Sequence, residues 1–157
     1  MLPQVYEEYV RKGKVELIFL DLPLQMHSRA LEAAKAVACA GEQQMFWDMH
    51  HQLFANQRAL APDDLATYAK ELGLDVAAFK ECLSGNRHLA GIRDDVRIVN
   101  SLGVYGTPAF LLGRRVPGGD KVEVLDIVKG LPPYAVLKEK LDALLAAEAP
   151  ARPPARQ

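Results

Sequence analysis

The chain has 157 residues, half of them hydrophobic, which is the size of one ordinary domain with a core of its own. Its 19 basic and 20 acidic side chains leave a formal net charge of -1, so no bulk field attracts nucleic acid or an anionic membrane. No apolar stretch reaches the roughly 18 residues that a membrane span needs. We therefore expect no nucleic-acid partner and no membrane span.

The N-terminal region changes from helical to strand spacing. Residues 4–12 have the apolar spacing of a helix that ends at Gly13. Residues 15–20, Val-Glu-Leu-Ile-Phe-Leu, are a short run rich in β-forming side chains, closed by Asp21 and Pro23, and they predict a buried strand. No apolar segment precedes a small-residue cleavage site here, so we expect no export signal.

A block of helices follows. Helical spacing begins at Ser28, the expected cap of the first helix, and continues in pieces to about residue 102. Pro62 is suited to the first turn of one helix and Gly73 to its end, while Asp75 is suited to cap the next. We therefore expect a helical subdomain at about 28–102.

The last third of the chain returns to strand spacing. Residues 109–112 and 122–128 predict two strands, with residues 113–114 as a turn and a helix after the second strand. The tail, residues 147–157, is low in complexity and is expected to be disordered. The order of elements indicates an α/β domain over residues 1–146 that carries an inserted helical subdomain.

The cysteines and histidines give no metal site in the sequence. Cys39 and Cys82 are 43 positions apart, which excludes a local redox pair and leaves too few ligands for a closed zinc site. His50 and His51 are adjacent, so on a helix their side chains point roughly 100° apart. We expect neither a metal nor a cofactor.

Several segments, in a fixed order, carry a resemblance to a known family. Gly-Thr-Pro at residues 106–108 enters an apolar strand. Upstream stand Asp-Leu-Pro-Leu at residues 21–24, Ala-Cys-Ala-Gly-Glu-Gln at residues 38–43 and Phe-Trp-Asp-Met-His at residues 46–50. Over residues 2–146 the chain resembles the DsbA family of thioredoxin-fold disulfide oxidoreductases.

The resemblance implies a thioredoxin-like fold, protein or peptide thiol and disulfide substrates, and a bacterial periplasmic or envelope location. In that family a Cys-x-x-Cys pair at a helix N-terminus performs the chemistry, because the helix dipole lowers the thiol pKa. The sequence has no such pair, so we expect no catalytic residue and no redox activity in the chain as it stands. Pro3 falls where the active-site helix of the family is kinked, so we interpret the sequence as starting part-way along that helix.

The resemblance also implies which residues contact substrate. A loop proline locked in the cis form offers no N–H and turns the preceding residue, so that its backbone can pair with an extended peptide. Gly106, Thr107 and Pro108 are thus the implied substrate-binding residues. Some relatives carry a second cysteine pair that forms a structural disulfide, which implies a bond between Cys39 and Cys82. Two inert buried thiols are the alternative.

The thioredoxin fold has a central strand that we do not find in this sequence. It would lie between the strands predicted at residues 15–20 and 109–112. Unpaired buried backbone groups cost roughly 1–3 kcal/mol each, whereas a domain has only about 5–15 kcal/mol of stability. An exposed apolar strand edge recruits another strand, so we expect the isolated chain to dimerise, aggregate or be unstable.

Two other functions remain as alternatives. One is a redox-inactive thioredoxin-like module that binds a peptide or partner. The other is a glutathione-dependent isomerase or transferase of the related kappa type, with a serine in place of the thiol. Kappa relatives show Val-Pro at the loop and Phe-Trp-Gly soon after it, whereas this chain has Thr107-Pro108 and then Arg-Val-Pro-Gly-Gly at residues 115–119. The kappa alternative is therefore the weaker one.

Overall fold

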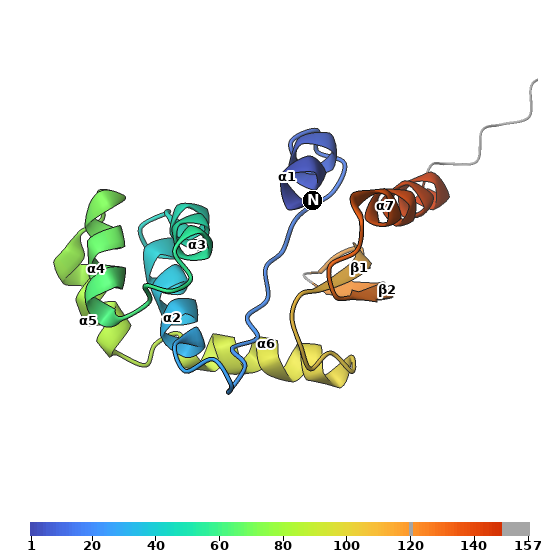
Figure 1. Ribbon diagram of the computed structural model, residues 1–157. Coiled ribbons are helices and arrows are strands. Elements are labelled where there is room, and N and C mark those ends of the chain that lie inside the picture. Colours follow the sequence, from blue (N-terminus) through green and yellow to red (C-terminus); the bar gives the residue numbers. More distant parts are fainter. Residues whose placement is uncertain (120, 149–157) are drawn as a thin grey trace, which may run out of the picture. The chain divides into compact units, whose positions relative to one another are not determined.

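The structure is a computed structural model that describes residues 1–119 and 121–148. The chain forms two compact units. One is Leu20–Tyr105, and the other joins Met1–Phe19 to the chain from Gly106 onward. Figure 1 shows their helices and the two-stranded sheet in the colours of the sequence.

The regular elements of the unit Leu20–Tyr105 are helices. Asp75 caps a helix as expected, because its carboxylate accepts hydrogen bonds from the N–H groups of Ala77 and Ala78 at 2.9 and 3.0 Å. Gly73 has a φ of +75°, a left-handed conformation that glycine adopts without strain after a helix end. The helices are α2 (Ala30–Gly41), α3 (Phe46–Ala55), α4 (Pro62–Glu71), α5 (Val76–Ser84) and α6 (Leu89–Ser101).

One cap was predicted at the wrong residue. The N-cap of α2 is Arg29 and not Ser28. Two short turns precede the helix, with hydrogen bonds from the His27 N–H to the Leu24 carbonyl and from the Ala30 N–H to the His27 carbonyl, both at 2.9 Å. These turns delay the start of regular helix by one residue beyond the position that the side-chain type favours.

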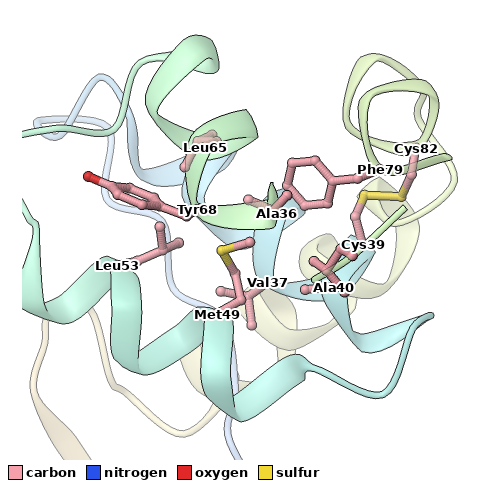
Figure 2. Close-up of a cluster of buried hydrophobic side chains, with 12 residues drawn as sticks. Ala36, Val37, Cys39, Ala40, Met49, Leu53, Leu65, Tyr68, Phe79 and Cys82 are labelled. Carbon is pink, nitrogen blue, oxygen red and sulfur yellow. A yellow bond between two sulfur atoms is a disulfide. The ribbon is translucent and has the colours of Figure 1, made fainter. Parts of the chain in front are cut away.

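The core of this unit is a cluster of apolar side chains from α2, α3, α4 and α5 (Figure 2). A disulfide joins Cys39 in α2 to Cys82 in α5 within this cluster, with their Cα atoms 5.8 Å apart. It therefore engages both cysteines of the sequence. The side chains with no exposed surface in this cluster are Ala36, Ala40, Met49, Leu65, Ala69 and Phe79.

The other unit packs helices against a small sheet. Tyr9, Leu112 and Leu137 are among its buried core residues. The Tyr9 hydroxyl donates to the Asp142 carboxylate at 2.6 Å, and the Lys138 ammonium donates to that carboxylate at 2.8 Å. The elements of this unit are α1 (Leu2–Val5), the π-helical η1 (Tyr6–Val10), β1 (Ala109–Arg115), β2 (Val122–Lys129) and α7 (Tyr134–Glu148).

The predicted turn at residues 113–114 is wrong, because both residues lie inside β1. β1 and β2 are antiparallel, with a register shift between Leu112 and Gly113. A Cβ atom at Gly113 would clash with the carbonyl oxygen of Glu123, so the close approach of the two backbones there requires glycine. The connection between the strands comes after Arg115, where the Val116 N–H donates to the Lys121 carbonyl at 2.8 Å.

The strand predicted at residues 15–20 is also wrong, since the structure assigns no strand there. In the part of the chain that the structure describes, β1 pairs with β2 and with no other strand. A strand needs a neighbour to bond its backbone groups, and the apolar pattern of the segment does not supply one. Leu17 and Ile18 are instead 37% and 51% exposed.

The last prediction on chain organisation placed a disordered tail at residues 147–157. Residues 147 and 148 belong to helix α7, so the prediction is wrong for these two residues. Residues 149–157 lie outside the described residues. None of the described helices is long and apolar enough to cross a membrane.

The exposed apolar segment leads to a test of self-association. We expect the isolated chain to self-associate at micromolar concentration, because an apolar extended segment and an open strand edge recruit another chain. Ile18→Lys is expected to shift sedimentation profiles toward the monomer. Leu131→Lys, at an apolar residue that is 71% exposed and far from this segment in sequence, is the matched control. A wild-type chain that stays monomeric at every concentration would contradict the expectation.

Candidate functional site

The residues expected to bind substrate, Gly106, Thr107 and Pro108, come directly before β1. All three are exposed, and the peptide bond between Thr107 and Pro108 is cis. The Pro108 carbonyl accepts a hydrogen bond of 2.8 Å from the N–H of Gly130, the residue after β2. This bond fixes the loop to the end of the sheet.

The backbone of Thr107 is open to a ligand. Among the residues that the structure describes, none forms a hydrogen bond with the Thr107 backbone or hydroxyl. Exposed backbone groups beside a strand can pair with an extended peptide, which then supplies the missing hydrogen bonds. The loop therefore presents main-chain groups of the kind that pair with an extended chain, but it contains no thiol or other nucleophile suited to disulfide exchange.

The two cysteines lie in the other unit and are each 1% exposed. Thiol–disulfide exchange requires a thiolate to reach a sulfur atom in line with the bond, so burial protects this disulfide. The disulfide lies in the apolar cluster of Figure 2 and acts there as a structural cross-link.

One polar side chain, His88, lies beside that disulfide and contacts the carboxylate of Glu42, and the sequence connects neither residue to the disulfide. A ring nitrogen of His88 and the sulfur atoms of Cys39 and Cys82 all lie within 4.8 Å of one another. His88 Nε2 is 2.8 Å from Oε1 of Glu42, and Arg87 is 3.5 Å from the other oxygen of that carboxylate. Glu42 and His88 are 46 positions apart, so only the packing of α2 with α5 brings them together.

A second polar pair is formed by Asp21 and Asp95, two acidic residues that sequence reasoning did not connect. The Asp21 N–H donates to Oδ2 of Asp95 at 3.0 Å. Burial raises the pKa of the Asp21 carboxyl to about 6, and the negative charge of Asp95 adds to this effect. Asp21 thus holds its proton at a pH where an ordinary aspartate is ionised.

The sequence did contain a signal for this pair. Asp95 lies three residues after Ile92 and four before Val99, which places it on the helix face that carries these two buried side chains. An acidic residue at a core-facing position destabilises the fold unless its carboxylate accepts a hydrogen bond. The Asp21 N–H is that donor.

Comparison with known proteins settles the family. A family model described as DSBA-like thioredoxin domain matches residues 4–128. The chain belongs to the DSBA-like thioredoxin domain family. The match includes the Gly106–Pro108 loop, the cysteines and nearly all of the sheet, so this DSBA-like domain is a member of the thiol–disulfide oxidoreductase family.

The relatives of this DSBA-like domain among curated proteins are much longer than the chain. It is 40% identical to Na(+)/H(+) antiporter NhaA 3 of Salinispora tropica over 78% of its length, which is 19% of that protein. It is 38% identical to Na(+)/H(+) antiporter NhaA 1 of Salinispora arenicola over the same shares, and 35% identical to Na(+)/H(+) antiporter NhaA of Herminiimonas arsenicoxydans over 66% of the chain and 17% of that protein. The chain thus spans about a fifth of these relatives. No solved structure matches it.

The raised pKa of Asp21 predicts a pH-dependent stability change. Because the folded state binds this proton more tightly, the stability that Asp21 contributes is complete below about pH 4 and is lost as the pH rises through about 6. Asp21→Asn should therefore stabilise the protein at pH 7 by about 1 kcal/mol, allowing for solvent screening of a partly exposed group.

The measurement is urea unfolding at pH 4 and pH 7. The gain should vanish at pH 4, where the wild-type carboxyl is protonated as well. Glu81→Gln, which removes an exposed carboxylate from α5, should show no such gain at pH 7. Equal effects of Asp21→Asn at both pH values would show that its proton is not involved.

Proposed function

We propose that this domain binds an extended peptide of a thiol- or disulfide-bearing protein at Gly106, Thr107 and Pro108. The observation that carries the proposal is the exposed Thr107, whose backbone forms no hydrogen bond within the described residues. Membership of the DSBA-like family supports a protein substrate. The binding mode is the addition of a peptide strand next to β1, with main-chain hydrogen bonds as the source of affinity.

We further propose that the chain by itself does not exchange disulfides. Exchange begins when a thiolate attacks a disulfide sulfur and a second thiolate leaves, so the protein must supply a reactive thiol. Both cysteines of this sequence are in one buried disulfide. Turnover then needs a cysteine pair from another polypeptide segment, whereas a redox-inactive binding module needs none.

The peptide surface is tested by changing the bulk of Thr107. Thr107→Arg should reduce the affinity for an extended, cysteine-containing peptide about tenfold or more, because a long charged side chain obstructs the approach to the backbone. Thr107→Val should bind nearly as well as the wild type, since the main chain makes the contact. Thr67→Arg, at an exposed threonine of α4, is the matched control.

Binding is measured by fluorescence anisotropy of a labelled peptide, and turnover by insulin reduction and peptide oxidation. Equal binding by Thr107→Arg and the wild type would refute the peptide surface. Turnover that disappears in Cys39→Ser would show that the buried disulfide is the redox centre. Turnover that requires glutathione would favour the kappa-type alternative.

A second candidate function is that of a module attached to an ion transporter. The observation that favours it is the identity of 40% and 38% to parts of two proteins named as Na(+)/H(+) antiporters, each about five times longer than the matching region. We infer that the natural polypeptide carries such a transporter segment, and that the domain then binds its peptide partner beside a membrane. An ion antiporter must itself span the bilayer.

An antibody against residues 20–105 tests this second candidate in the organism of origin. We expect it to detect a polypeptide several times heavier than 157 residues, in the membrane fraction. A band with the size of the 157-residue chain in the supernatant would contradict the inference. The peptide-binding proposal is unaffected by either result.

A further inference from the structure

The disulfide lies where three helices end or begin. Cys39 is in the last turn of α2 and Cys82 in the last turn of α5, while His88 is the N-cap residue of α6. The two sulfur atoms and a ring nitrogen of His88 lie within 4.8 Å of one another. Two soft sulfur atoms and an imidazole are the donor set of many zinc sites.

We propose that reduction of the Cys39–Cys82 bond creates a binding site for a thiophilic divalent cation such as Zn²⁺. The two thiolate sulfurs and His88 are its ligands, and Glu42 is the positioning residue that holds the imidazole ring. Zn–S bonds of about 2.3 Å and Zn–N bonds of about 2.0 Å place neighbouring ligand atoms roughly 3.5–4 Å apart. A ring nitrogen of His88 lies within 4.8 Å of both sulfur atoms, so it needs to move by only about 1 Å to reach this spacing, while the two sulfurs must separate when their bond is broken.

The contact between His88 and Glu42 supports the site. A metal-binding histidine usually donates its second ring N–H to a carboxylate, which fixes the tautomer and the orientation of the ring. His88 Nε2 is 2.8 Å from Oε1 of Glu42. The Arg87 guanidinium, 3.5 Å from the other oxygen of Glu42, places a positive charge nearby and opposes the cation. It pairs with Glu42 and does not belong to the ligand cluster.

Because the site is buried, thiolates that bind a metal are favoured there over thiolates that have no charge partner. Cys39 and Cys82 are each 1% exposed and lie among apolar side chains such as Phe79 (Figure 2). Such surroundings disfavour thiolate anions that have no charge partner. A divalent cation balances both charges, while the partly exposed His88 gives the ion a route from solvent.

The redox step balances with an external dithiol as the reductant. The dithiol gives two electrons and two protons to the protein disulfide, which becomes two thiols, and the reductant leaves as its own disulfide. Binding of M²⁺ by the two thiols then releases two protons. The metal-bound and disulfide-bonded forms exclude each other, since each uses both sulfur atoms.

The test compares the oxidised and reduced forms of the whole chain. The protein is reduced with a dithiol, freed of reductant under argon, and titrated with Zn²⁺ against a chromophoric chelator. We expect one equivalent to bind to the reduced chain and none to the oxidised chain. Titration with Co²⁺ should give the intense thiolate-to-cobalt charge-transfer absorption that marks sulfur ligands.

Variants separate a built site from nonspecific thiol binding. Cys39→Ser should abolish stoichiometric binding, and His88→Ala should weaken it by about 100-fold or more, because each change removes a ligand. Glu42→Gln should weaken it by about tenfold, within the range typical of residues that orient ligands. His27→Ala, at an exposed histidine outside the cluster, is the matched control and should bind as the wild type does.

Circular dichroism keeps the test decisive if reduction loosens the helices. Helical signal that is lost on reduction and restored by one equivalent of Zn²⁺ would support the site, because metal binding is then coupled to folding. The proposal is overturned if the reduced wild type binds no more tightly than Cys39→Ser, or if His88→Ala leaves the affinity unchanged.

Discussion

The bond between Cys39 and Cys82 is the constraint on which the helical unit depends most. It joins the C-terminal turns of α2 and α5 inside the main apolar cluster. Closing a loop of 43 residues lowers the entropy of the unfolded chain enough to stabilise the fold by about 4 kcal/mol, in the chain-entropy view. That is a large part of the roughly 5–15 kcal/mol that a domain possesses. The same bond engages both sulfur atoms, so it also determines which chemistry is open to the chain.

A different constraint acts on the unit that contains β1 and β2. Within the described residues, β1 and β2 pair only with each other, and an isolated hairpin is marginal in water. The side chains of Val5, Tyr9, Leu137 and Leu141 supply the missing cover, and the Tyr9–Asp142 hydrogen bond fixes the helices that carry them. Residues from the N-terminal and C-terminal parts of the chain therefore cover the sheet, and the sheet in turn holds the Gly106–Pro108 loop.

The elements that could be predicted from the sequence are those whose signals are local. Asp75 caps α5 and Gly73 follows α4 because capping depends on a few neighbouring residues. The strand expected at residues 15–20 fails because strand formation depends on a neighbour that no local pattern reveals. The turn predicted at Gly113 is wrong for a related reason. In the sequence, a glycine that allows two strands to approach closely cannot be distinguished from a glycine in a turn.

The same distinction between local signals and long-range contacts applies to the candidate sites. The Gly106–Pro108 loop could be found from a contiguous motif, and its exposure and cis bond are seen in the structure. The pairs Asp21–Asp95 and Glu42–His88 join residues that are 74 and 46 positions apart. Tertiary packing creates both pairs. The sequence marks Asp95 as an acidic residue on a core-facing helix position, but it does not reveal that Asp21 is its partner or that Glu42 lies next to His88.

Peptide binding and the redox state of the disulfide should be separable properties of this domain. The proposed peptide surface belongs to the unit with β1, whereas the disulfide belongs to the helical unit. Each of its cysteines is 1% exposed, so burial keeps both sulfur atoms from a peptide partner. A reductant can therefore reach the disulfide only when the helical core opens. Reduction of the bond should then lower the stability of the helical unit and leave peptide binding at the loop unaffected. A bound cation would offset that loss by holding the same helix ends together. The disulfide exchange of the family and the cation binding proposed for Cys39 and Cys82 therefore involve different cysteines, and each can be measured without the other.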